Sequence, residues 1–390
     1  MEILFFCLVP KVDLYSSLAD EFAQNGHRVT FVTPTEEETG FNDLGQHRVL
    51  NFHAGKMLNV SIPRKGINNL LFSSFCSKAV KKNITPKDYN LILMSTPPLG
   101  FLSSIKWIKK ENPDIKFYLI LRDIHPEGAT HILKKVPGLY SYFKKQAQSL
   151  YTISDVVGCM SPYNVKLIQD KYLPRRHDKV QLLPNWGRKI EYKAPSEEIR
   201  EKYGLKWKYV IIYGGNMGKP QNLTLFLRIA KEKQHLKDVL FLFIGSGTER
   251  EKLRTIVKEE KINNVRIENF IPKEDYDDVL RCADVGIITL HPLSFFANCP
   301  SKTVSYWQNK IPIFASLDDK TDYGTYFIDR SGSGLWSLAT DFDMLSSNFD
   351  KLYYNADLRK QMGENGYKFF MENYTVDKAY ENIMNALNIK

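Results

Sequence analysis

Lys302 lies where a helix is expected to begin. The stretch ANCPSKTVSYWQNKIPIF covers residues 297–314, and its Ser301 is a residue type that commonly caps helix N-termini. Lys302 would then occupy the first turn, at the positive end of the helix dipole, which favours anions. Either this lysine points into water, or it binds a phosphate that also receives backbone N–H groups of the helix start. A bound anion would explain a cation at this position.

A glycine-containing turn, YGGNMGKPQNL at 213–223, follows one predicted strand and precedes a predicted helix. Gly215, Asn216 and Gly218 would let a phosphate approach the backbone closely, and Lys219 would add a mobile positive charge. The spacing is neither that of a dinucleotide-binding fingerprint nor that of a P-loop. A phosphate-binding loop and a plain strand–helix turn therefore fit these residues equally well.

A second glycine turn, GSGTERE at 245–251, follows a later strand. Gly245 again allows close approach, and Ser246 offers a hydroxyl to a phosphate, a ribose or a sugar. The alternative, which so short a stretch favours, is a simple turn in which Thr248 caps the next helix.

Four polar side chains end an apolar run in the first half of the chain. The segment LRDIHPEGATH at 121–131 contains Arg122, Asp123, His125 and Glu127. A carboxylate and an imidazole at the end of a strand suit an acid, a base or a group that positions hydroxyls. The alternative to a functional role is an ion pair of Arg122 and Asp123 at the surface, next to a turn whose conformation Pro126 fixes. No metal site is predicted here, because a third ligand is missing.

These side chains need secondary structure that brings them together. Apolar runs predict strands at 2–9, 27–33, 90–96, 116–123 and 155–161, and again at 208–215, 239–247, 264–271, 283–290 and 311–316. Helical patterns, such as those at 13–25 and 222–233, alternate with them, which predicts an α/β fold with covered parallel sheets. The alternation of predicted strands and helices begins again at residue 208, which predicts two units joined near residues 182–189. Ligands of such sheets bind beyond the carboxyl ends of the strands, where the candidate residues lie.

The composition favours anionic partners. The 390 residues carry a formal net charge of +10, and their 43% hydrophobic and 25% charged content is ordinary for a soluble globular protein. Nucleotides, phosphates, nucleic acid and an acidic membrane all fit this charge, but no nucleic-acid-binding motif occurs, so no nucleic-acid partner is expected. The five scattered cysteines lack metal-ligand spacing, which favours reduced thiols in a cytosolic compartment.

Two segments combine basic and aromatic residues. In both 62–83 and 132–151, lysines alternate with large apolar side chains. A helix with an apolar and a basic face can lie on an anionic bilayer, whereas a helix packed on the core with solvated lysines is the usual alternative. Both interpretations fit. No apolar run reaches the ~20 residues of a spanning helix, and the N-terminus lacks the features of a signal peptide.

The ordered set of motifs resembles bacterial glycosyltransferases of the GT-B fold, most closely the family 4 type of capsule, exopolysaccharide or O-antigen synthesis. The residues that carry the resemblance are Gly26-His27, Arg122–Glu127, Leu183-Pro184-Asn185, Tyr213–Gly218, Gly245-Ser246-Gly247, Asn264-Val265 with Phe270, Ala283-Asp284-Val285 and Pro300-Ser301-Lys302. They span nearly the whole chain. Each motif is weak alone, and the set is specific for the fold and the broad activity but not for the sugar.

This resemblance implies an α/β chain with two Rossmann-like domains that face a central cleft. Residues 1–185, with a C-terminal helix at about 375–390, would bind the acceptor. Residues 186–374 would bind a nucleotide-diphosphate sugar, with a UDP-sugar as the expected donor. The implied activity is transfer of a hexosyl or N-acetylhexosaminyl group, with retention of configuration, to a glycan or polyprenyl-linked acceptor at the inner face of the cell membrane.

The same resemblance assigns roles to individual residues. The donor would be bound by Gly215, Asn216, Gly218, Lys219, Gly245, Ser246, Ser301, Lys302 and Ser305. Asp123 and His125 would be catalytic, and Arg122 and Glu127 would bind the acceptor. Neither a metal nor a cofactor is expected, because loop amides, basic side chains and a helix N-terminus would stabilise the leaving diphosphate.

The sequence departs from the family at two glutamates that usually stand eight residues apart. Ala297 and Ser305 occupy these positions. The second glutamate normally binds the donor ribose, so Ser305 would offer a weaker hydroxyl contact, and Gln221 stands where a basic residue is usual. These changes leave two alternatives open: a non-catalytic GT-B subunit of an active partner transferase, and a nucleotide-sugar epimerase of the same fold.

Overall fold

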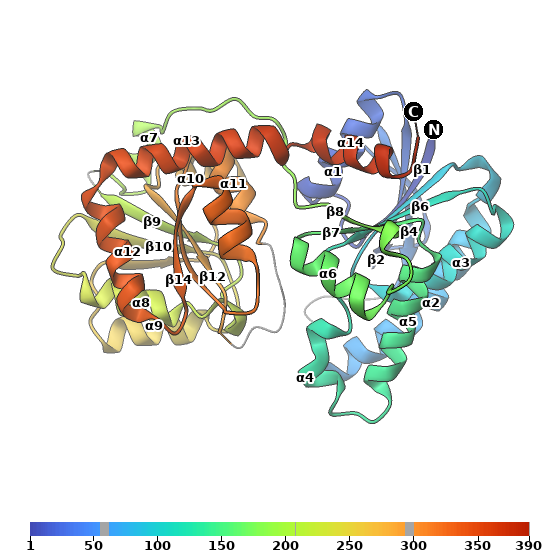
Figure 1. Ribbon diagram of the computed structural model, residues 1–390, viewed down its shortest axis with the longest axis horizontal. Helices are drawn as coiled ribbons and strands as arrows, with labels where there is room; N and C mark the ends of the chain where they lie inside the picture. The colour runs from blue at the N-terminus through green and yellow to red at the C-terminus, as the bar shows by residue number, and fades with distance from the viewer. Residues whose placement is uncertain (55–61, 207, 293–299, 390) are drawn as a thin grey trace. The chain divides into compact units, whose positions relative to one another are not determined.

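The chain forms two compact α/β units in its computed structural model, which describes residues 1–54, 62–206, 208–292 and 300–389 (Figure 1). Unit 1 comprises Met1–Arg188 and Val376–Lys390, and unit 2 comprises Lys189–Thr375. Each unit contains a mainly parallel, Rossmann-like sheet, so the predicted α/β class with two Rossmann-like domains is confirmed.

The sheet of unit 1 has the strand order β3-β4-β2-β1-β5-β6-β7-β8. Its strands are β1 (Glu2–Phe6), β2 (Arg28–Thr35), β3 (Gly40–Leu44), β4 (His47–His53), β5 (Leu91–Ser95), β6 (Lys116–Leu121), β7 (Val156–Cys159) and β8 (Val180–Leu182). All neighbours pair in parallel except β3 and β4, which form an antiparallel hairpin. The apolar runs correctly predict β1, β2, β5, β6 and β7. They miss the edge strands β3 and β8 and the neighbouring strand β4, because these strands are partly exposed or contain polar residues that interrupt an apolar run.

Helices cover both faces of this sheet. They are α1 (Asp13–Gln24), α2 (Ile62–Asn83), α3 (Leu102–Glu111), α4 (Thr130–Leu133), α5 (Leu139–Ile153), α6 (Pro162–Lys171) and α14 (Val376–Ala386). Leu18 and Phe22 of α1 pack with Ile383 of α14 on one face. Helices α2, α3, α5 and α6 cover the other face, where Phe72 and Ile105 are buried. Burial on both sides explains why the central strands are apolar throughout.

The end of the chain is anchored to unit 1 through α14. Tyr380 packs edge-on against Phe22 with ring centroids 4.9 Å apart, and its hydroxyl lies 3.1 Å from Nε2 of His27. The amphipathic pattern at the C-terminus therefore reflects packing against α1.

The sheet of unit 2 has the strand order β11-β10-β9-β12-β13-β14. Its strands are β9 (Tyr209–Gly214), β10 (Val239–Ile244), β11 (Val265–Glu268), β12 (Val285–Thr289), β13 (Ile313–Leu317) and β14 (Gly334–Leu338). Its helices are α7 (Glu197–Lys202), α8 (Thr224–Glu232), α9 (Arg250–Glu259), α10 (Lys273–Arg281), α11 (Lys302–Gln308), α12 (Phe342–Tyr354) and α13 (Ala356–Asn373). The apolar runs predict all of these strands except β14.

Two groups of helices sandwich this second sheet. Phe226 of α8, Leu253 of α9 and Phe349 of α12 belong to one buried cluster. On the opposite side, α11 packs against α13 (Figure 1). The ring centroids of Trp307 and Phe369 lie 5.4 Å apart in this contact. The loops at the strand ends are thereby supported from both faces.

Each sheet reverses its order of strand addition at one place. In unit 1 the reversal lies between β1 and β5, and in unit 2 it lies between β9 and β12. Such switch points open a crevice beyond the carboxyl ends of the strands, which is where open α/β sheets bind ligands. They define where the candidate site residues should be sought in each unit.

Candidate active site

Two glycine loops of unit 2 are bonded to each other beyond β9 and β10. The N–H of Gly215 donates to the Ile244 carbonyl over 2.9 Å, and that of Met217 donates to the Ser246 carbonyl over 2.7 Å. Gly245 has a φ of +139°, and a Cβ placed there would lie 2.0 Å from the Gly215 carbonyl oxygen. Because only glycine permits this approach, the two turns form one continuous backbone surface.

This pairing decides which loop amides are open to a ligand. The N–H of Gly218 donates to Oε1 of Gln221 over 3.1 Å, so it is engaged, as is that of Gly215. Within the described ranges, no hydrogen bond engages the N–H of Asn216 or of Ser246. The sequence assigns phosphate binding to the loop as a whole. The structure singles out Asn216 and Ser246 as its open amides, and the glycines shape the backbone.

Lys302 approaches the same loops from the first turn of α11. Its Nζ lies 3.8 Å from the ring centroid of Tyr213 and 3.6 Å from the position that a Cβ on Gly215 would take. No carboxylate in the described part of the chain pairs with this ammonium. Burial lowers the pKa of Lys302 to about 7. The half-buried cation beside the glycine loops favours the anion-binding interpretation over a lysine that points into water.

Ser301 and Ser305 flank Lys302 on the same helix. Ser301 occupies the N-cap position, but its side chain makes no capping hydrogen bond and its backbone is already helical, with φ −59° and ψ −28°. The expectation that its side chain caps the helix is therefore wrong. The Ser305 hydroxyl is partly exposed and makes no hydrogen bond to the described residues, so it is open to a ligand. Ala297 lies outside the described residues.

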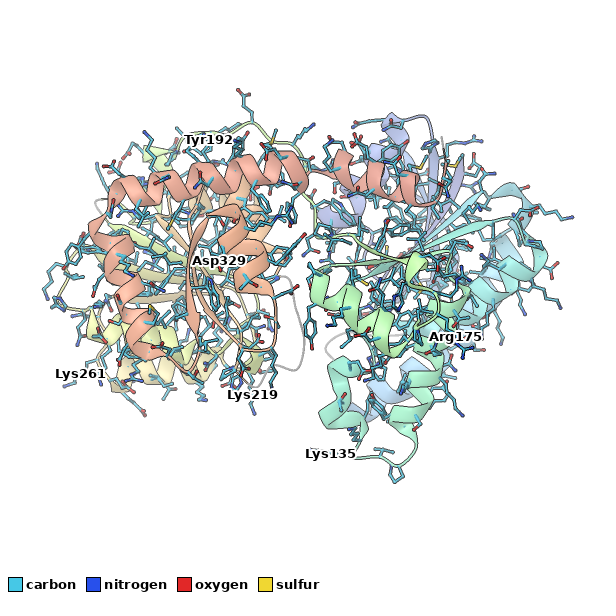
Figure 2. The ribbon with its side chains drawn as sticks, viewed as in Figure 1. Lys135, Arg175, Tyr192, Lys219, Lys261 and Asp329 are labelled. Carbon is cyan, nitrogen blue, oxygen red and sulfur yellow. The ribbon has the colours of Figure 1, made fainter. Side chains whose placement is uncertain are left out.

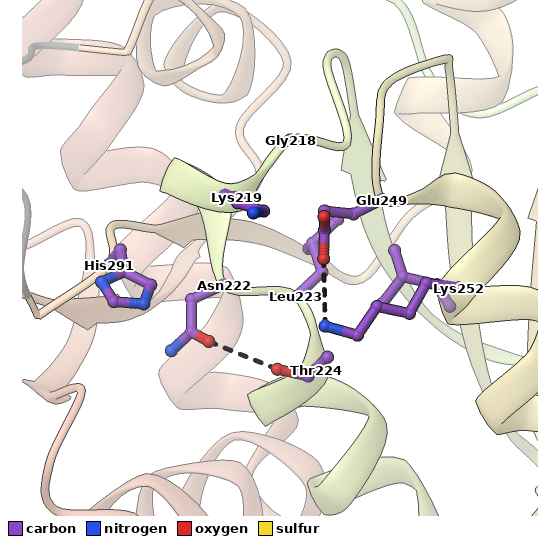
Figure 3. A pocket seen from close by; sticks show the side chains of 9 residues that line it. Gly218, Lys219, Asn222, Leu223, Thr224, Glu249, Lys252 and His291 are labelled. Carbon is purple, nitrogen blue, oxygen red and sulfur yellow. Dashed lines mark hydrogen bonds and ion pairs between the residues drawn. The ribbon is translucent and has the colours of Figure 1, made fainter. Parts of the chain in front are cut away.

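Lys219 lines a separate cavity of about 200 Å³ at the starts of α8 and α9 (Figure 3). The other polar residues of its lining are Asn222, Thr224, Glu249, Lys252 and His291. Glu249 holds Lys252 at 3.1 Å, whereas Lys219 is exposed at the surface (Figure 2) and has no ion pair within the described residues. Lys302 does not line this cavity. Thr248 does not cap α9 as expected, because the helix begins two residues later, at Arg250.

Phe270 is a candidate that the sequence motifs did not assign to the site. It follows β11 at the same edge of the sheet, and 76% of its surface is exposed. An exposed ring at this edge can stack on a flat heterocycle. An aromatic residue near the carboxyl end of the predicted strand 264–271 was the signal that could have identified it.

A polar cluster lies at the switch point of unit 1. Oη of Tyr15, on α1, is 2.8 Å from Oγ of Ser95, at the end of β5. The Thr96 hydroxyl accepts the N–H of Arg122 over 3.0 Å and donates to the Asp123 carbonyl over 3.2 Å. These bonds bring residues after β1, β5 and β6 together. The sequence motifs include Arg122 and Asp123 but not Tyr15.

The Asp123 carboxyl group belongs to this cluster and remains accessible to solvent. Desolvation by the surrounding groups raises its pKa, and the nearby Arg122 guanidinium opposes that shift. A carboxyl group whose pKa is raised is suited to accept a proton near neutral pH.

His125 is not joined to Asp123. Among the described residues, neither side chain has a hydrogen bond, and the His125 ring packs edge-on against Phe143 at 4.9 Å. Burial lowers the pKa of His125, although Glu127 opposes that shift, so the imidazole is neutral near pH 7. The structure thus provides no acid–base dyad from these two residues.

Glu127 is already bound within unit 1. Its carboxylate accepts hydrogen bonds from the hydroxyls of Tyr140, at 2.9 Å, and Tyr172, and it pairs with Lys171 at 2.6 Å. Burial raises its pKa, but the bonds from Lys171, Tyr172 and Tyr140 outweigh this and hold the pKa below its usual range. Glu127 therefore supports the turn after β6, and acceptor binding by this residue stays a prediction.

Replacing Glu127 with Gln is expected to lower the free energy of unfolding by about 1–3 kcal/mol at pH 7, because the charge-assisted bonds to a part-buried carboxylate are lost. Because the folded-state pKa is depressed, this contribution exists above the unfolded pKa and disappears as pH falls through the folded one. Urea titrations at pH 7 and below about pH 4 should show the difference shrinking.

Glu260→Gln is the matched control, since Glu260 pairs with Lys231 at the surface of unit 2. It should change the free energy of unfolding by less than about 0.5 kcal/mol. An equal effect from both substitutions would contradict a structural role for Glu127.

The two basic segments differ in how their apolar residues are placed. In α2, Phe72 and Val80 are buried and Lys78, Lys81 and Lys82 are exposed, which fits packing on the core. In the second segment, Val136 of the connection between α4 and α5 and Tyr142 of α5 are instead about half exposed, at 52% and 50%. Lys134 and Lys145 of this segment are exposed, as is Lys135, which is labelled in Figure 2. In α2, Leu71 is also exposed, at 44%, so both segments present apolar and basic groups to solvent, and the second segment does so with two large apolar side chains.

Three further expectations concern metals, membrane spans and cysteines. Across the described residues, no group of three or more His, Cys, Asp or Glu side chains could hold a metal ion. No described helix is both long and apolar enough to cross a bilayer. Cys7, Cys76, Cys159 and Cys282 are buried free thiols, and Cys299 lies outside the described residues.

The sequence of unit 2 matches a known family. Residues 195–369 match the model of the glycosyl transferases group 1 family. The UDP-glycosyltransferase TURAN of Arabidopsis thaliana is 25% identical over 114 residues, which are 29% of this chain and 24% of that protein. The match thus spans about a quarter of the curated relative's length.

The fold of the whole chain is similar to those of several solved glycosyltransferases. Sucrose-phosphate synthase from Thermosynechococcus elongatus superposes with a TM-score of 0.76 at 14% identity, covering 100% of this chain and 98% of that one. WaaG, a glycosyltransferase involved in lipopolysaccharide biosynthesis, gives 0.72 at 13%, covering 98% and 99%. HepE from Anabaena in complex with UDP gives 0.70 at 12%, covering 100% of both chains. Residues 195–369 are therefore similar to the glycosyl transferases group 1 family, within a chain that has the GT-B fold.

Proposed function

We propose that this protein is a glycosyltransferase that moves a hexosyl or N-acetylhexosaminyl group from a nucleotide-diphosphate sugar to a glycan or polyprenyl-linked acceptor in cell-surface polysaccharide synthesis. The reaction retains anomeric configuration and needs no metal. Unit 2 binds the donor and unit 1 binds the acceptor. The family match of unit 2 and the GT-B fold support the general activity.

The observation that carries the proposal is Lys302. A half-buried ammonium lies beside two paired glycine loops, and no acidic group of the described chain neutralises it. The open amides of Asn216 and Ser246 lie on the same loops. A diphosphate supplies the missing negative charge, accepts these N–H groups and faces the start of α11.

The nucleotide is proposed to be a uridine diphosphate. The support comes from similar proteins: HepE was solved with UDP, and the curated relative is a UDP-glycosyltransferase. Phe270 offers its exposed ring to the uracil, and the Ser305 hydroxyl faces the ribose in place of the usual glutamate.

Unit 1 is proposed to work at the inner face of the cell membrane. Residues 134–145 support this, since Val136 and Tyr142 are exposed in the same segment as the exposed Lys134, Lys135 and Lys145. Such a mixed surface suits an anionic bilayer that carries a lipid-linked acceptor.

Thermal-shift measurements with UDP-, GDP-, dTDP- and CMP-sugars test the donor assignment. A UDP-sugar should raise the melting temperature, since a ligand at 100 times its Kd adds about 2.7 kcal/mol of stability. No shift with any of these donors would contradict the proposal. Transfer to an added acceptor would then exclude an epimerase and a non-catalytic subunit.

The affinity for UDP is expected to fall as pH rises above 7. Burial places the pKa of Lys302 at about 7, so above that pH the free protein holds a neutral amine. A bound diphosphate favours the ammonium, so binding must take up a proton. The association constant should decrease by about tenfold per pH unit between pH 7.5 and 9, which calorimetry in buffers of different ionisation enthalpy can measure.

Lys302→Arg is the control for this pH dependence. A guanidinium stays charged throughout this range, so its binding curve should be flat above pH 7. A pH-independent association constant for the wild-type protein would contradict the assignment of Lys302 as the diphosphate cation.

A further inference from the structure

Tyr213 touches both halves of the candidate donor site. It is the second-last residue of β9 and is fully buried. One face of its ring lies 3.8 Å from Nζ of Lys302, and its hydroxyl donates to the carbonyl of Asn216 over 2.6 Å. The same side chain therefore contacts the candidate cation and the turn that carries an open amide.

We propose that Tyr213 is a positioning residue of the donor site, whose ring holds the Lys302 ammonium toward the diphosphate and whose hydroxyl fixes the Asn216 turn. This inference rests on the proposed function of unit 2. It adds a residue that makes its contribution through Lys302 and Asn216 and does not itself touch the donor.

The ring is the structural partner of the ammonium. No acidic side chain of the described residues pairs with Lys302, so the negative face of the Tyr213 ring provides its favourable contact. Gly215 leaves the ammonium uncovered, because a Cβ at that position would stand 3.6 Å from Nζ. A carboxylate in place of the ring would neutralise the charge that the diphosphate needs, whereas an aromatic ring orients the cation without cancelling it.

The Tyr213 hydroxyl stabilises the turn at Asn216. Burial raises the pKa of Tyr213, so the phenol stays protonated and can donate to the Asn216 carbonyl. With that carbonyl held inward and the Gly215 N–H bonded to Ile244, the Asn216 N–H is the next amide along the turn and remains open. The hydroxyl therefore helps to fix the conformation in which this amide faces solvent.

A double-mutant cycle on UDP binding tests the ring. Tyr213 is replaced by phenylalanine, which is the reference, and then by phenylalanines that carry an increasing number of fluorine atoms. With Lys302 present, this series should weaken binding stepwise, by about 3- to 30-fold in total, since fluorine removes the negative ring face and keeps the shape. In the Lys302→Ala background the same series should have no effect, because the coupled partner is absent. If UDP affinity is the same across the fluorinated variants in both backgrounds, or falls equally in both, the proposed role of the ring is overturned.

The variant Tyr213→Phe itself tests the hydroxyl. It keeps the ring and should weaken UDP binding by about 2- to 10-fold, as expected for one neutral hydrogen bond, while the pH dependence set by Lys302 stays unchanged. Tyr209→Phe is the matched control, since Tyr209 lies on the same strand, is buried and has an arginine, Arg359, over its ring at 4.9 Å. Equal UDP affinity in Tyr213→Phe and the wild type overturns the hydroxyl's role.

The outcomes separate this inference from the function on which it rests. If the wild-type protein binds no nucleotide sugar, the proposed function fails. If it binds UDP and loses affinity in Lys302→Ala but not across the fluorinated series, only the positioning role of the Tyr213 ring fails.

Discussion

Lys302→Ala is expected to reduce kcat/KM for sugar transfer by about a hundred- to a thousandfold, the cost of removing one preorganised group that stabilises developing negative charge. The leaving nucleotide gains charge on its diphosphate as the glycosidic bond breaks. In the structure, Lys302 is a half-buried cation beside the paired glycine loops and has no acidic partner among the described residues. Steady-state kinetics with a radiolabelled donor and calorimetric titration with UDP would measure the loss.

Lys310→Ala provides a closely matched comparison. Lys310 follows the same helix and also lies over a tyrosine ring, at 4.6 Å from the centroid of Tyr192, but it is paired with Glu364 at 2.9 Å. Its removal should leave UDP affinity within about twofold of the wild type, because a neutralised lysine has little charge to offer an anion. Equal losses in the two variants would mean that Lys302 has no special role.

Removal of Lys302 is also expected to stabilise the protein without ligand. The folded-state pKa of this lysine is lowered to about 7, so its charged form carries a desolvation cost that is fully present below pH 7. This cost declines as pH rises from 7 toward the ordinary lysine pKa. Lys302→Ala should therefore raise the melting temperature more at pH 6 than at pH 9, although it weakens donor binding.

Asp123→Asn is expected to lower kcat by about a hundred- to ten-thousandfold, while UDP affinity stays at the wild-type value. Asparagine keeps the shape of the side chain but cannot accept a proton or carry a charge. Asp123 lies at the switch point of unit 1, where its backbone carbonyl accepts a hydrogen bond from the Thr96 hydroxyl and its carboxyl group interacts electrostatically with Tyr15 and Arg122. Desolvation raises its pKa, so the wild-type rate should fall at mildly acidic pH as the carboxylate is protonated.

Asp114→Asn is the control for this substitution. Asp114 is exposed just before β6, at the opposite end of the strand that Asp123 follows. It should leave kcat unchanged. A full rate in Asp123→Asn, or a parallel loss of UDP affinity, would contradict a role in the transfer step.

Local sequence patterns predict much of the fold. The central strands of both sheets, such as β1 and β9, are apolar runs because helices cover both of their faces. Strands near one sheet edge, such as β3 and β4, escape detection because polar residues interrupt their sequences and pairing with neighbouring strands supplies most of their stabilisation. The side chain of Ser301 illustrates a related limit, since a capping residue type predicts the helix start but not whether its hydroxyl makes the bond.

For the candidate site too, local sequence predicts some features and the tertiary structure decides others. The sequence by itself determined that glycines, Lys302, Asp123 and their neighbours follow strands, which places them at the ligand-binding edges of two parallel sheets. Only the tertiary structure decided that the loops at Gly215 and Gly245 bond to each other, that Lys302 lies on the ring of Tyr213, and that Tyr15 meets Ser95. These partners are separated by about 30 to 90 positions in the chain, so no local pattern encodes them. Their meeting follows from strand order and from helix packing, which are properties of the assembled core.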